Sequence, residues 1–177
     1  MHRFACLFLI LLSIGNFAAV LAQEKNAQTP KKLADGVYAV LREGPKEKDL
    51  LPLKDGEGLV VDLHPYLKKE DREAPRYLVV HSKPDVELDL AGEPKAVKEG
   101  DDVVRILLKL QPTAAAALER LTTNNVGKQV TIILAGDVVT AHKIRDVIKG
   151  GEVQISCCAP GSAKYLLERL QEKHAKK

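Results

Sequence analysis

Hydrophobic and polar residues alternate most regularly in the second half of the chain. Residues 103–110 carry an apolar side chain at every second position and charged Arg105 and Lys109 between them. This period of two predicts a strand with one buried face. Residues 129–135 are nearly all apolar and predict a strand buried on both faces, followed by a turn at Gly136 and a short strand at 138–140. Residues 152–157 alternate again and predict another strand.

Three stretches of the same half predict helices. One begins at Pro112-Thr113, because proline suits a first turn and the hydroxyl can cap it. A second is predicted from Thr140 as its cap to residue 148, with Gly150-Gly151 as its end. The third covers 162–174, where leucines and an alanine form one apolar stripe.

The first half reads as strands and turns. Short runs rich in Val, Leu or Tyr are separated by Gly-Pro, Asp-Gly and Lys-Pro pairs, which are typical of turns. The runs are 37–41, 58–63, 76–81 and 86–90.

From residue 103 the predicted order is β-α-β-β-α-β-α, and its first six elements match the βαββαβ order of ferredoxin-like folds. We therefore expect an α+β fold, with an antiparallel sheet that has helices on one face. We divide the chain into a signal peptide (1–22), a polar tether (23–34), a strand-rich N-terminal part (35–100) and a C-terminal part (101–177).

The signal peptide is predicted from an apolar run behind a short basic start. His2 and Arg3 precede the run, and Val20-Leu21-Ala22 offers the small residues that a signal peptidase needs, so we expect cleavage between Ala22 and Gln23. The protein would then be periplasmic or secreted. The alternative is a retained signal that anchors the chain in a membrane, because the run is long enough to span one.

Composition argues against nucleic acid as a partner. All three Phe and the single Met lie in the first 22 residues, there is no Trp, and the formal net charge of +3 is spread over runs of mixed sign. The chain has neither a basic patch for phosphates nor aromatic platforms for bases.

Residues 121–139, which read L-T-T-N-N-V-G-K-Q-V-T-I-I-L-A-G-D-V-V, resemble the head subdomain of the first periplasmic domain in the SecD/SecDF protein-export family. The resemblance extends over about residues 103–170, and His142 and Cys157-Cys158 depart from the family's pattern. It implies a head subdomain without the transmembrane helices of SecD, linked to protein export. The motif positions, which we interpret as structural, are Thr122, Asn125, Gly127, Lys128, Gly136, Ala141, Ile144, Ile148, Gly151 and Ile155.

Cys157 and Cys158 are the most chemically suggestive pair. They are interpreted as incidental or structural thiols, as a disulfide within or between molecules, or as a redox site. The scattered histidines lack the spacing of a zinc site. The acidic groups Asp101-Asp102 and Asp85-Glu87-Asp89 are better explained as solvated positions than as catalytic pairs, and no nucleophile, phosphate-loop or metalloprotease motif occurs.

We therefore expect no enzyme, no cofactor, no metal site and no small-molecule substrate. The leading hypothesis is an exported accessory or binding module whose partner is an unfolded exported chain or a component of the translocation machinery or the envelope. Binding to such a chain would use a sheet edge or an apolar groove. One alternative is a self-associating structural protein of the envelope, and a weaker one is a thiol-redox or metal protein that uses Cys157 and Cys158.

Overall fold

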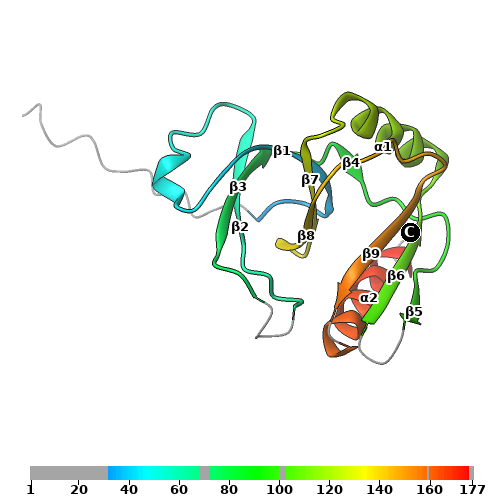
Figure 1. Ribbon diagram of the computed structural model, residues 1–177. Coiled ribbons are helices and arrows are strands. Elements are labelled where there is room, and N and C mark those ends of the chain that lie inside the picture. Colours follow the sequence, from blue (N-terminus) through cyan, green and yellow to red (C-terminus); the bar gives the residue numbers. More distant parts are fainter. Residues whose placement is uncertain (1–31, 68–71, 100–102, 159, 176–177) are drawn as a thin grey trace, which may run out of the picture.

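A computed structural model describes residues 32–67, 72–99, 103–158 and 160–175, and the predicted signal peptide lies outside them. Figure 1 shows the arrangement of its strands and helices. In chain order the elements are β1 (Gly36–Gly44), the 3-10 turn η1 (Glu47–Asp49), β2 (Glu57–Asp62), β3 (Arg76–His81), β4 (Val86–Glu87), β5 (Lys95–Glu99), β6 (Val103–Lys109), α1 (Pro112–Asn124), β7 (Gln129–Leu134), β8 (Asp137–Lys143), β9 (Glu152–Cys158) and α2 (Pro160–Ala175).

The strands form two antiparallel sheets. The larger has the order β2-β3-β1-β7-β8, with β4 pairing with β1 beside this path, and the smaller has the order β5-β6-β9. β1 connects the two halves of the sequence, because Val37 pairs with Ile132 of β7 and Val40 with Val80 of β3. The proposed boundary near residue 100 lies outside the described residues, and strands from both sides of it share the larger sheet.

The larger sheet curls. β2 and β8 are its two edges in the hydrogen-bonding order, yet Cα atoms of these strands come within 8 Å of each other. A small core of buried side chains lies on its concave side: Tyr38, Leu78, Val80, Ile133 and Val138. Because β2 and β8 approach each other without pairing, the curled sheet has an open seam between them.

The smaller sheet and both helices enclose the main core. α2 packs against β5, β6 and β9, and α1 packs against β4. The alternating apolar side chains predicted for β6 are buried as expected, while Leu107 and Lys109 between them are exposed. This core includes Val37, Tyr66, Val86, Leu88 and Leu90 from the first half of the chain. The two halves therefore share one hydrophobic core.

The predicted helix from Thr140 to residue 148 is wrong. Thr140 lies inside β8, paired with Ile132, and residues 144–148 form an irregular connection. Ile144 is buried and exchanges backbone hydrogen bonds with residues 127 and 128. The spacing of Ile144, Val147 and Ile148 is that of a helical stripe, although Ile144 is buried in an irregular connection and Ile148 packs against the main core.

The ferredoxin-like order in one sheet is also wrong for this chain. β6 pairs with β9 in the smaller sheet, while β7 and β8 pair with each other and with β1 in the larger one. The α+β class and antiparallel pairing are confirmed, and β5 is a strand that the pattern did not predict. None of the helices in the described part of the chain is both long enough and apolar enough to cross a bilayer.

Candidate functional site

The motif threonine lies at the end of α1 and holds the helix to the connection after β8. Thr122 is fully buried, its hydroxyl donates to the Leu118 carbonyl at 2.9 Å, and it accepts a bond from the Ile148 backbone N–H at 3.1 Å. One hydroxyl thus forms hydrogen bonds with backbone groups of its own helix and of Ile148, which lies 26 residues further along the chain.

The next motif residues complete the same junction. Asn125 closes the helix by donating from its amide to the Leu121 carbonyl at 2.8 Å. Gly127 has a φ of 84°, which glycine adopts without steric cost, and its N–H donates to the Ile144 carbonyl at 2.9 Å. The Ile144 N–H donates in turn to the Lys128 carbonyl at 2.8 Å. The contacts of these residues are with backbone groups of neighbouring segments.

The remaining motif positions lie at turns and in the sheets. Ala135 and Gly136 both have positive φ, 53° and 84°, as the tight turn between β7 and β8 requires. Ala141 packs against the small core, and Ile155 is fully buried in the main one. Gly151 has a φ of 70°, and a Cβ there would overlap α1 at Ala115.

The two cysteines lie at the end of β9. The register shifts there, because Arg105 pairs with Ser156 while Val104 pairs with Cys158, so Cys157 is the extra residue of a bulge. The side chains of Cys157 and Cys158 lie outside the described part of the structure. Their role as thiols or as a disulfide stays a prediction.

The acidic and histidine candidates that the structure describes take part in local polar contacts. Asp85 holds a turn: one carboxylate oxygen lies 2.8 Å from His81 Nδ1 and the other accepts from the Ala39 N–H at 2.8 Å. His142 is exposed, with its Nε2 2.6 Å from the Thr140 hydroxyl. Asp101 and Asp102 lie outside the described residues. Within the described ranges, no three His, Cys, Asp or Glu side chains group as metal ligands would.

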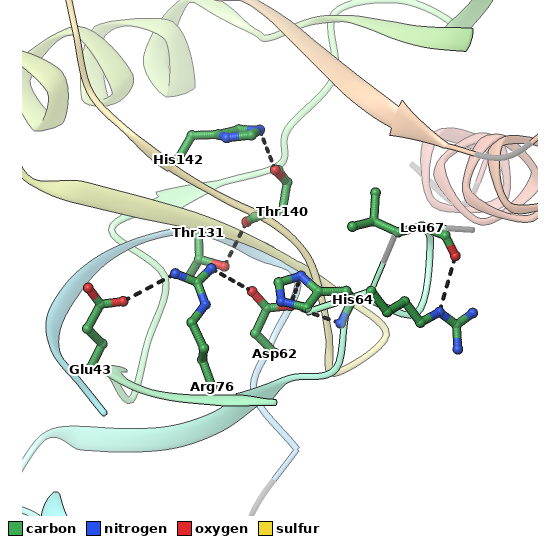
Figure 2. Close-up of polar contacts among 9 residues, drawn as sticks. Glu43, Asp62, His64, Leu67, Arg76, Thr131, Thr140 and His142 are labelled. Carbon is green, nitrogen blue, oxygen red and sulfur yellow. Dashed lines mark hydrogen bonds and ion pairs between the residues drawn. The ribbon is translucent and has the colours of Figure 1, made fainter. Parts of the chain in front are cut away.

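A cluster of polar side chains around the buried Asp62, at the end of β2, was not predicted (Figure 2). Asp62 is 2% exposed, its Oδ2 lies 3.1 Å from Arg76 Nη2, and its Oδ1 accepts from the backbone N–H of His64 at 3.1 Å. The His64 Nδ1 lies 3.2 Å from the same oxygen, and Glu43 lies 3.5 Å from the other arm of Arg76. Because the buried carboxylate is paired and hydrogen-bonded, the cluster fixes the bend that leads the chain out of β2. A lone Asp in a predicted strand gave no signal of it.

An apolar groove of about 470 Å³ follows the open seam of the curled sheet. Leu59, Val61 and Leu63 line one side, and the other side is formed by the β7–β8 turn and the start of β8. Leu63 is 52% exposed. In the described part of the chain, the backbone pairing of β2 is with β3 alone, so the edge of β2 that faces the seam has free hydrogen-bonding groups. The alternation of Leu59, Val61 and Leu63 is visible in the sequence, but the seam beside it is not.

Comparisons with known proteins point to one family. The family model for the SecDF P1 head subdomain matches residues 67–170. Protein translocase subunit SecD of Calditerrivibrio nitroreducens is 39% identical over 51 residues, which are 29% of this chain and only 10% of that protein. The chain therefore corresponds to a small part of that relative.

Two solved structures are similar as well. One comes from work on the structure and function of a membrane component SecDF that enhances protein export; it is 28% identical, covers 62% of this chain and 46% of that one, and has a TM-score of 0.44. The other, SecDF in its Super-membrane-facing form, is 20% identical, covers 78% of this chain and 18% of that one, and has a TM-score of 0.49. The family model covers residues 121–139 and confirms the resemblance seen there. Because it matches more than half of this chain's residues, the chain belongs to the SecDF P1 head subdomain family.

Proposed function

We propose that this protein is an exported, non-catalytic module that binds extended apolar segments of exported polypeptides. Its family supports a role in protein export, since a relative bears the name protein translocase subunit. The observation that carries the proposal is the apolar groove beside the edge of β2 that pairs with no other strand in the described part of the chain. No cofactor enters this function.

The groove suits an extended chain for two reasons. The free backbone groups of β2 can pair with another strand, which gives affinity without dependence on sequence. Leu59, Val61 and Leu63 offer apolar contacts to every second side chain of that strand, since successive side chains point to opposite faces. An unfolded exported chain supplies both features, whereas a folded protein has already paired its strands.

The same proposal includes export to the periplasm or the exterior by a signal peptide cleaved between Ala22 and Gln23. If the signal is retained, the module stays at a membrane by its own anchor. Measuring the mass of the protein recovered from the cell envelope distinguishes a cleaved signal peptide from a retained one. A mature chain that begins at Gln23 supports cleavage, and an intact N-terminus overturns it.

Site-specific photocrosslinking in exporting cells tests the binding role. A photoreactive residue replaces Leu63 in the groove, and a matched control replaces Leu107, which is 41% exposed on the smaller sheet. We expect exported chains to crosslink at position 63 and much less at 107. Equal yields at both positions, or none beside a working positive control, contradict the proposal.

A further inference from the structure

The segment just before β1, Lys32–Asp35, lies across the seam of the curled sheet; we call it the strap. Leu33 packs against the small core and touches β2, where a Cβ on Gly58 would lie 3.0 Å from its Cδ2. The aliphatic part of Lys32 lies over Gly136, and a Cβ there would overlap it. A glycine on each side of the seam therefore leaves room for the strap.

Polar contacts fasten the strap near its C-terminal end. The hydroxyl of Tyr38 donates to the Ala34 carbonyl at 2.6 Å. The Asp35 carboxylate accepts from the Ala135 N–H at 2.7 Å and lies 3.5 Å from Lys173 Nζ. These few bonds link the strap to the β7–β8 turn and to the end of α2.

The strap and the groove share space. Lys32 and Leu33 are among the residues that line the groove, and Leu33 fills its end between β2 and the turn. We propose that the strap is a displaceable occupant, so that an extended apolar segment competes with Leu33 for the groove. This inference rests on the proposed function of the groove. Leu33 shows the kind of side chain that the seam accepts, and its half-buried position means that few contacts must break for it to leave.

Loosening the strap without altering the groove tests this competition. Tyr38→Phe removes the bond to Ala34 and keeps the buried ring, and Asp35→Ala removes the contacts with Ala135 and Lys173. The matched control is Tyr165→Phe, a tyrosine that is 46% exposed on α2. The probe is a fluorescein-labelled peptide of alternating leucine and threonine, followed by fluorescence anisotropy on the folded chain.

We expect each loosened variant to bind the peptide about threefold to tenfold more tightly than the parent, the factor that corresponds to one hydrogen bond. The control should bind like the parent, and Leu63→Asp should weaken binding in every background. A peptide with proline at alternate positions cannot pair with β2 and should bind weakly.

Hydrogen exchange of the Ala135 amide provides a second readout, because that N–H bonds to Asp35. Peptide binding should speed its exchange if the strap leaves. If the peptide binds the variants no more tightly than the parent, and the Ala135 amide of the parent exchanges at the same rate with and without peptide, the strap is a fixed part of the fold. This inference is then overturned while the proposed function stands. If the peptide binds neither the parent nor the loosened variants, the proposed function fails and the inference fails with it.

Discussion

The rings of Tyr66 and Tyr165 stack with their centroids 6.4 Å apart and their planes 19° apart. Tyr66 belongs to the connection that leaves β2, and Tyr165 lies on α2 beside the smaller sheet. Tyr66 is 5% exposed, whereas Tyr165 is 46% exposed. This pair joins the charged bend at Asp62 to the helix that covers the main core.

The stacked rings should make the contributions of Tyr66 and Tyr165 to the free energy of unfolding depend on each other. Tyr66→Ala, Tyr165→Ala and the double variant form a cycle that isolates the interaction. We expect a coupling free energy of about 0.5–1 kcal/mol, toward the lower end for aromatic pairs because one ring is half in solvent. Urea unfolding of the four proteins measures it, and additive losses would mean that the rings stabilise the fold independently.

Alkaline pH should destabilise the protein through two buried tyrosines. Burial is the largest cause that raises the pKa of Tyr66, followed by the nearby Asp137, and the pKa reaches about 12. Burial and then the carboxylates of Asp35 and Asp85 raise the pKa of Tyr38 to about 12 as well. The folded pKa lies above the unfolded value of 10.0, so this stability is complete below pH 10 and is lost as pH rises from about 10 to 12.

Comparison with a phenylalanine variant isolates that effect. Tyr66→Phe keeps the ring and removes the titrating hydroxyl, so its free energy of unfolding should fall less than that of the parent between about pH 8 and about pH 11. Denaturant unfolding at both pH values is the measurement. The same decrease in parent and variant would assign the alkaline loss to other groups.

The hydroxyl of Thr122 should contribute more to the free energy of unfolding than the hydroxyl of its neighbour Thr123. Thr122→Val removes the acceptor of the Ile148 N–H at a buried site and should cost about 1–3 kcal/mol of unfolding free energy. Thr123→Val is the matched control, because its exposed hydroxyl also donates within α1, to the Glu119 carbonyl at 2.7 Å. We expect the control to change stability by less than about 0.5 kcal/mol. Equal losses would remove the special role of the Ile148 contact.

Gly151 should tolerate no side chain. Its φ of 70° disfavours other residues, and a Cβ would overlap Ala115, so Gly151→Ala should cost roughly 2–4 kcal/mol from strain and overpacking together. Gly92→Ala is the control, because a Cβ there meets nothing within 4 Å. Thermal unfolding of both variants checks the difference. A stable Gly151→Ala protein would show that α1 can move away from the turn.

The locally encoded elements were predictable because their signal lies within a few residues. The alternation in β6, the proline start of α1 and the apolar run of β7 each follow from one short pattern. The motif around Thr122 was predictable for a related reason: its residues bond mostly to neighbours in the chain, or to one connection that follows β8.

The candidate site was less predictable. The alternating Leu59, Val61 and Leu63 predicted a strand. The groove is also lined by the turn at Gly136 and the strap at Leu33, which lie far from that strand in the sequence. Asp62, His64 and Arg76 meet only because β2 and β3 pair in one register. A charge that is buried by tertiary contacts has the same appearance in the sequence as a solvated one.

By itself the sequence determined the α+β class, most of the strands, both helices and membership of an export family, because periodicity and motif spacing are local properties. Tertiary structure alone decided which strands became neighbours. The nearly continuous apolar run of β7 does not specify a pairing partner, and only the packing of the whole chain places β7 beside β1, with side chains in both cores. This pairing brings β2, β3, β1, β7 and β8 into one sheet. The edge strands β2 and β8 of that sheet approach each other, and the groove lies at the seam between them.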